Sequence, residues 1–145
     1  MKVCIINPLI TGEQRYGRIF KDAGGRQAPL GILYIAAVLE QDGYKVSVID
    51  AEAEGINLEE IKKRLDDFKP EVVGLTASTV AFNKAVETAS FVKEKFPSII
   101  TVAGGAHPTA IPQEALREEC FDVGVVGEAE MTFLELVRAI EKNEP

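Results

Sequence analysis

Short apolar segments recur along this chain, separated by longer segments in which apolar residues return every three or four positions. The short segments are rich in Val and Ile and lack a strict alternation of apolar and polar residues; they cover 3–7, 45–50, 71–77, 99–104 and 122–127. Strands that are buried on both faces of a parallel sheet have this composition. The pattern therefore predicts five parallel strands.

The longer segments have the apolar spacing of helices. Residues 30–42 are apolar on nearly every side, so we expect a deeply buried helix that ends at Gly43. Capping residues and apolar faces mark the other predicted helices, which begin at Asn57, cover 82–96, begin at Pro112 and begin at Thr132. Strands and helices thus alternate along the chain.

This alternation predicts an α/β fold in which helices cover both faces of one parallel sheet, because strand–helix–strand crossovers are right-handed. We expect a Rossmann-like (flavodoxin-like) three-layer fold with the strand order 2-1-3-4-5, which chains of five such units commonly adopt. The 145 residues suffice for one domain. We place this domain at residues 1–140 and the start of a linker to a following domain at 141–145.

Composition narrows the possible partners. The net charge of −7 argues against a nucleic-acid-binding protein, and no apolar run is long enough to cross a bilayer. Cys4 and Cys120 provide neither a disulfide framework nor a four-cysteine metal site, and we expect two buried, reduced thiols. These features predict a cytoplasmic protein with no nucleic-acid or membrane partner.

Ligands of open α/β sheets bind beyond the carboxyl ends of the strands. The connection after the first predicted strand has about twenty residues, where such connections usually have ~2–6. It carries basic and aromatic residues, namely Arg15, Tyr16, Arg18, Phe20, Lys21 and Arg26. Two interpretations stay open: the segment closes over an anionic or flat ligand, or it is a surface loop that another domain orders.

Several motifs are absent from the strand ends. Residues 7–10, N-P-L-I, stand where a dinucleotide-binding fold has G-x-G-x-x-G, and the chain has no G-x-x-x-x-G-K-[ST] phosphate loop. Residues 76–78, T-A-S, stand where a phospho-acceptor receiver domain has an aspartate. A stand-alone enzyme is disfavoured as well, because one histidine and two separated cysteines make no nucleophile–base pair.

Small and hydroxyl residues instead follow three neighbouring predicted strands. They are Thr76, Ser78, Thr79, Gly104, Gly105 and Gly127. Small residues at adjacent strand ends leave a trough in which a bulky ligand can approach the backbone. A structural interpretation also stays open for two groups: the glycine pair forms a tight turn, and Ser78 and Thr79 cap the helix that begins near Ala81.

Four segments carry a resemblance to a known family. They are APLGILYIAAVLEQDGYKVSVIDA at 28–51, VVGLTAST at 72–79, VAGGAHPTAIPQEAL at 102–116 and DVGVVGEAEMTFLELV at 122–137. With them, the chain resembles the cobalamin-binding-type domain at the N-terminus of many radical S-adenosylmethionine enzymes, which include cobalamin-dependent methyltransferases and the anaerobic magnesium-protoporphyrin monomethyl ester cyclase. The resemblance implies a Rossmann-like domain whose strand ends cradle cobalamin and whose interior accepts the nucleotide tail.

The resemblance also implies site residues. Ser78 matches the family's serine after the third strand, and Gly104 and Gly105 match its glycine pair. The wider family ligates cobalt through the histidine of a D-x-H-x-x-G motif, which residues 7–12, N-P-L-I-T-G, lack. We therefore expect cobalamin without histidine ligation of that type, and neither a catalytic nor a metal-ligating residue in this chain. The predicted cofactor-binding residues are Asn7, Pro8, Leu9, Thr76, Ser78, Thr79, Gly104, Gly105, His107, Gly127 and Glu128.

His107 is the only histidine of the chain. It follows the fourth predicted strand rather than the first, so ligation of cobalt is the least favoured interpretation of this residue. Two others stay open, namely contact with the cofactor tail or a neighbouring domain, and a local role in the turn.

The radical chemistry of the family requires a C-x-x-x-C-x-x-C motif, which this chain lacks. The resemblance therefore implies that the 4Fe-4S cluster and S-adenosylmethionine belong to a C-terminal domain of the same polypeptide. The expected function is to position cobalamin for methyl transfer or cyclase chemistry carried out with that domain. The alternative is a degenerate domain that binds no cofactor and serves docking or substrate binding, and the missing D-x-H-x-x-G motif favours it.

Overall fold

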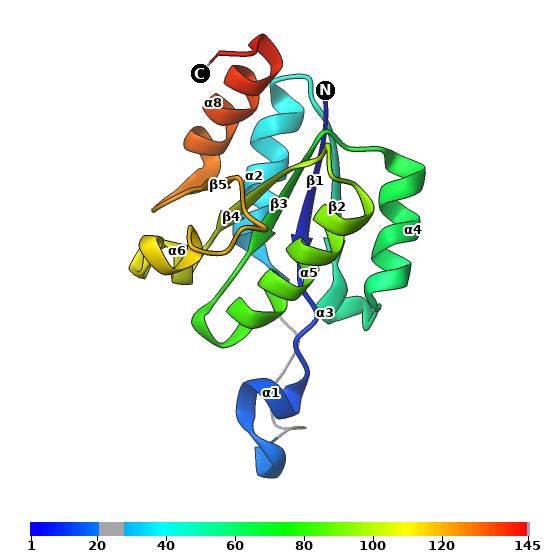
Figure 1. Ribbon diagram of the computed structural model, residues 1–145, viewed down its shortest axis with the longest axis vertical. Helices are drawn as coiled ribbons and strands as arrows, with labels where there is room; N and C mark the ends of the chain where they lie inside the picture. The colour runs from blue at the N-terminus through cyan, green and yellow to red at the C-terminus, as the bar shows by residue number, and fades with distance from the viewer. Residues whose placement is uncertain (21–27, 145) are drawn as a thin grey trace.

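The computed structural model describes residues 1–20 and 28–144. It contains a five-stranded parallel sheet in the order β2-β1-β3-β4-β5, which confirms the predicted Rossmann-like topology (Figure 1). The strands are β1 (Lys2–Asn7), β2 (Lys45–Asp50), β3 (Val72–Thr76), β4 (Ile100–Gly104) and β5 (Val123–Gly124). In the middle of the sheet, Ile5 pairs with Val48 on one side and with Gly74 on the other.

Helices cover both faces of the sheet, as predicted. α2 packs beside α8 over one face, and α4 lies beside α5 over the other (Figure 1). The helical elements are α1 (Gly12–Tyr16), η1 (Arg18–Phe20), α2 (Leu30–Gln41), α3 (Ala51–Glu54), α4 (Leu58–Phe68), η2 (Thr79–Ala81), α5 (Phe82–Lys95), α6 (Ala106–Ala110), α7 (Pro112–Ala115) and α8 (Ala129–Lys142). In the parts of the chain that the structure describes, no helix is both long and apolar enough to cross a membrane.

Alternate residues of β1 belong to two separate apolar cores. Val3 and Ile5 join the core beneath α2 and α8, whereas Cys4 and Ile6 join the core beneath α4 and α5. A strand that is buried on both faces has no polar face, which explains why the sequence of β1 is a continuous apolar run. Cys4 and Cys120 are both buried and free of a disulfide, as expected.

The prediction that the helix at 30–42 is buried on nearly every side is wrong. Ile32, Ala36 and Leu39 are buried, but Leu30 is 61% exposed and Tyr34 is 63% exposed. α2 makes its main contacts with α8, β1 and β2, which all lie on its inner side. A helix in an outer layer of a three-layer fold has one covered side, however apolar its sequence is.

Two helices begin with reciprocal capping boxes. Asn57 Oδ1 accepts a hydrogen bond from the backbone N–H of Glu60 at 3.0 Å, and Asn57 N–H donates in turn to Glu60 Oε2 at 3.0 Å, as the sequence predicts for α4. Thr11 and Gln14 form the same arrangement at the start of α1. The long connection after β1 therefore begins with a structured turn.

The same connection is tied to α3 by an ion pair. Arg15 Nη2 lies 2.7 Å from Glu52 Oε2, and each side chain is partly buried. Tyr16 is 45% exposed. Lys21 and Arg26 lie outside the described residues, so the two interpretations of this segment stay predictions.

The last helix begins earlier than predicted, at Ala129 rather than at Thr132. Glu128 precedes the helix without a side-chain cap, and Thr132 lies inside it, where its hydroxyl donates to the backbone oxygen of Glu128 at 3.4 Å. α8 then runs back along the sheet to Lys142, past the predicted boundary at residue 140. The Met1 ammonium lies 3.5 Å from Glu141 Oε1, so both ends of the fold meet at the amino edge of the sheet.

Candidate functional site

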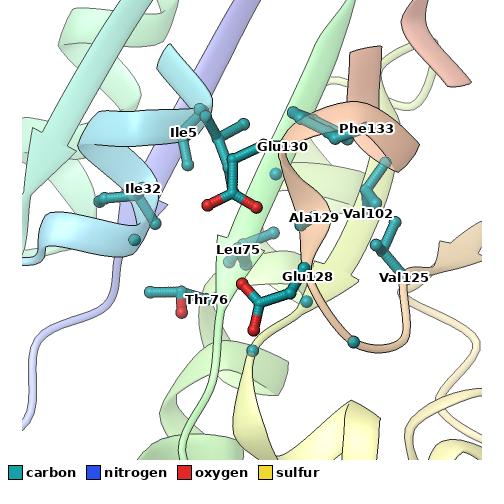
Figure 2. Close-up of a pocket in the computed structure, with 16 residues that line it drawn as sticks. Ile5, Ile32, Leu75, Thr76, Val102, Val125, Glu128, Ala129, Glu130 and Phe133 are labelled. Carbon is teal, nitrogen blue, oxygen red and sulfur yellow. The ribbon is translucent and has the colours of Figure 1, made fainter. Parts of the chain in front are cut away.

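A hollow of about 160 Å³ lies at the carboxyl edge of the sheet, between α2 and the start of α8 (Figure 2). Its walls are mostly apolar and include Ile5, Ile32, Ile35, Leu75, Val102, Val125 and Phe133. The sequence-predicted residues that the fold brings together here are Thr76, Gly104, Gly105, Gly127 and Glu128. An apolar concavity with a few polar groups is typical of a small-molecule site.

Two carboxylates give one side of this hollow a polar margin. Glu128 and Glu130 project from the start of α8 toward the end of β3, where Thr76 lies (Figure 2). The dipole of α8 stabilises negative charge at this position. Because the two carboxylates repel anions, this side of the hollow disfavours an anionic ligand group.

A second hollow of about 210 Å³ adjoins the first. It is lined by Asn7 at the end of β1 and by Ser78 after β3. Gly31, Ile32 and Thr76 line both hollows, so together the two form one trough across the carboxyl ends of β1, β3 and β4. This is the edge at which ligands of open α/β sheets bind.

Ser78 contributes a buried hydroxyl to this trough. Its Oγ is inaccessible to solvent and has no hydrogen-bond partner among the residues that the structure describes. The backbone oxygen of Ser78 accepts from the N–H of Ala81 at 3.0 Å, but its side chain makes no capping bond to η2. Ser78 therefore occupies the N-cap position of η2 without a capping bond from its side chain, and its buried hydroxyl is left unpaired beside the hollow. Thr79, the next residue, is exposed within η2.

The two adjacent glycines differ in whether the fold requires a glycine at their position. Gly105 has φ = +100°, and a Cβ atom on it would lie 2.9 Å from the backbone nitrogen and oxygen of Ala77 and from Thr76 Oγ1. A Cβ on Gly104 would meet no described atom within 4 Å. Gly105 is thus required by the turn and by the close approach of β3, whereas Gly104 leaves open space in the hollow.

His107 is part of the core rather than of the trough. It is 3% exposed, and its ring stacks on that of Phe82, with centroids 3.9 Å apart and an interplanar angle of 27°. Within residues 1–20 and 28–144, neither ring nitrogen has a hydrogen-bond partner, and Nε2 lies 3.8 Å from Glu114 Oε2. The residue lines neither of the two adjoining hollows. The geometry supports the local role among the interpretations of His107.

The remaining predicted residues surround the end of β1. Asn7 Nδ2 donates to Asp50 Oδ1 at 2.8 Å, so the Asn7 side chain is anchored toward β2. Pro8 is almost fully buried. Leu9 lies apart from the trough, in a separate hollow that Ile56 also lines. Gly127, with φ = +81°, turns the chain into α8, and its N–H donates to Thr109 Oγ1 at 3.0 Å.

Sequence reasoning missed several residues of the trough. Ile35 and Phe133 form its walls, and both follow from helical spacing, because each belongs to the inward side of its helix. Glu130 was not distinguished from other surface acids. Gly31, within the apolar run of α2, was also missed, although a glycine inside a helical pattern is an available signal. Within residues 1–20 and 28–144, no three His, Cys, Asp or Glu side chains gather in a way that could hold a metal ion.

Comparison with known proteins identifies the family. The model of the B12 binding domain matches residues 19–137. An uncharacterized methyltransferase of Pyrococcus horikoshii is 35% identical over 144 residues, which make up 99% of this chain and 30% of that protein. The anaerobic magnesium-protoporphyrin IX monomethyl ester cyclase of Rubrivivax gelatinosus is 33% identical over 145 residues, or 99% of this chain and 25% of that protein. The chain thus spans less than a third of either relative.

The fold also recurs in a solved structure. The radical S-adenosylmethionine methyltransferase TsrM from Kitasatospora setae matches with a TM-score of 0.82 and 18% identity, over 99% of this chain and 26% of that chain. This similarity establishes the fold, and the family model, which covers most of the sequence, establishes the relationship. The chain belongs to the B12 binding domain family.

Proposed function

We propose that this chain binds cobalamin along the trough at the carboxyl edge and positions it for a radical S-adenosylmethionine domain of the same polypeptide. The observation that carries this proposal is the trough itself, which is open, mostly apolar, and bordered by Ser78 and Gly104. Relatives named as a methyltransferase and a magnesium-protoporphyrin cyclase support it, because the similarity to each of them extends over nearly the whole length of this chain.

The residues present fit the nucleotide tail of cobalamin. The buried, unpaired hydroxyl of Ser78 would hydrogen-bond a polar group of the tail. Gly104 leaves room for the tail to lie against the end of β4, and the apolar walls would surround its aromatic base. Gly127 and Glu128 would border the tail on the α8 side.

The end of β1 would face the corrin ring. Asn7, which lines the trough, is held there by its hydrogen bond to Asp50, and the buried Pro8 follows it. These positions provide no histidine, and His107 is enclosed by its contact with Phe82. We therefore propose that cobalamin is bound without a histidine ligand from this chain.

When bound, the corrinoid supplies a cobalt centre for methyl transfer or cyclase chemistry. This chain's own residues hold the cofactor, orient it, and exclude water from its tail. The iron–sulfur cluster and S-adenosylmethionine would belong to the further domain, because this chain has two cysteines and no C-x-x-x-C-x-x-C motif.

The test is an anaerobic titration of the purified chain with hydroxocobalamin, followed by desalting and a visible spectrum. We expect the chain to retain about one equivalent of corrin. Ser78→Ala should retain less, whereas Ser98→Ala, a hydroxyl deletion at an exposed position that lines neither hollow, should bind like the parent chain. If the folded chain retains no corrin, the proposal fails and the cofactor-free docking alternative takes its place.

A further inference from the structure

Gly31 lies in the first turn of α2, where neither the backbone angles nor the neighbours within residues 1–20 and 28–144 require a glycine. Its φ is not in the positive range, and a Cβ atom built on it would lie more than 4 Å from every atom of the described part of the chain. Glycine lowers the stability of a helix relative to alanine because it loses more backbone entropy on folding. The fold would therefore accept a side chain at this position.

The open space beside Gly31 belongs to the candidate site. Gly31 lines both hollows of the trough, and so does Thr76 across from it at the end of β3. Ile35, one helical turn further along α2, lines the mostly apolar hollow between α2 and α8. Side chains four positions apart point to the same side of a helix, so a side chain at position 31 would project into the passage between the hollows.

We propose that Gly31 is a specificity-determining residue of this site, whose missing side chain keeps the two hollows joined for a single ligand. The ligand would place an apolar ring in the hollow between α2 and α8 and a polar group beside Ser78. This inference rests on the proposed function, in which the ligand is cobalamin. It adds that the residue at position 31 of α2 limits the size of a ligand that can occupy both hollows at once.

The test compares Gly31→Leu with Ala37→Leu in the same hydroxocobalamin titration. Ala37 is an exposed residue of the same helix that lines neither hollow, so it controls for the added bulk. We expect Gly31→Leu to weaken binding about tenfold or more, because overpacking a filled site is unfavourable, and Ala37→Leu to bind like the parent chain. Equal binding by the parent and Gly31→Leu would overturn the role of Gly31 and leave the proposed function intact.

Thermal unfolding without cofactor provides an independent readout. Gly31→Ala should raise the Tm by about 2–3 °C, because it adds a helix-favouring residue in open space. A lower Tm would show that the fold itself needs this glycine and would overturn the inference. If the parent chain retains no corrin, the proposed function fails, and the change in Tm still decides whether the space beside Gly31 is needed by the fold.

Discussion

The backbone N–H of Thr101 donates a hydrogen bond to Asp122 Oδ2 at 2.7 Å. The Thr101 hydroxyl lies 2.9 Å from the same carboxylate oxygen and 2.6 Å from the backbone oxygen of Cys120, and its single proton is shared between these two acceptors. Lys93 Nζ, from α5, approaches Asp122 Oδ2 at 2.5 Å. β5 has only two residues, so few ladder hydrogen bonds hold it to β4. The Asp122 carboxylate therefore fixes the chain just before the segment that carries Gly127 and Glu128 into the site.

This arrangement predicts a pH-dependent contribution to stability. Burial acts to raise the pKa of Asp122, but hydrogen bonds from Lys93 and Thr101 outweigh it and hold that pKa below its ordinary value. The contribution is complete above the ordinary pKa of aspartate, about 3.9, and is lost as the pH falls through the lowered value. Urea unfolding of the parent chain and of Asp122→Asn between pH 7 and pH 2.5 measures it.

Asp122→Asn should be less stable at pH 7 by about 1 kcal/mol, a small effect because solvent screens the partly exposed carboxylate. The difference between the two proteins should shrink as the pH falls. A constant difference over the whole range would show that the charge of Asp122 does not contribute.

The adjacent glycines should respond differently to the same substitution. Gly105→Ala should lower the free energy of unfolding by about 2 kcal/mol or more, because its positive φ and the 2.9 Å approach to Ala77 leave no room for a Cβ. Gly104→Ala should change the unfolding free energy little. Chemical denaturation of both variants measures this, and equal losses would contradict the distinction.

A larger side chain in place of Gly104 should weaken cofactor binding without changing the fold. Gly104→Leu fills space that the trough leaves open, so its corrin retention should fall while its circular dichroism spectrum stays that of the parent. Full retention by this variant would remove Gly104 from the proposed ligand surface.

His107→Phe should fold and bind as the parent chain does. The substitution keeps an aromatic ring against Phe82 and removes two buried nitrogens that have no hydrogen-bond partner. His107→Ala, in contrast, leaves a cavity and should lower the free energy of unfolding by roughly 2–3 kcal/mol. Loss of corrin retention by a stable His107→Phe variant would instead show that the imidazole contacts the cofactor.

Both cysteines should be unreactive in the native chain. Burial raises the pKa of the Cys4 thiol to about 12 and, with a smaller effect, raises that of Cys120 as well. Since the thiolate is the reactive form, Ellman's reagent at pH 8 should label neither residue until denaturant is added. Rapid labelling of the native protein would show that one of the two thiols is accessible.

The sheet could be predicted from the sequence because its strands are buried on both faces, and such burial leaves a continuous apolar run. The same logic overestimated the burial of α2: Leu30 and Tyr34 are apolar, yet both are more than half exposed, and Leu30 lines the open second hollow rather than the core. Whether an apolar helix face is covered depends on neighbouring elements, which the helix's own residues do not specify. The start of α8 was misplaced because Thr132 with Glu135 fits a capping pattern inside the helix as well.

At the site, residue type was predictable and geometry was not. Gly104 and Gly105 are the same residue type, and their different roles follow only from the packing of the end of β3 against the turn at Gly105. The sequence around Ser78 fits a helix cap, but in the structure its side chain makes no capping hydrogen bond to η2. Gly31 was overlooked because its surroundings in sequence are apolar, whereas its surroundings in space are the passage between two hollows.

The pairing of Met1 with Glu141 has a practical consequence for biosensor work. Both ends emerge at the amino edge of the sheet (Figure 1), whereas the trough lies at the carboxyl edge. A chain anchored to a chip through a tag at either end would therefore present its carboxyl edge to the flowing solution. Immobilisation in both orientations should give the same affinity for a corrinoid analyte, which offers an internal check that the signal comes from that edge.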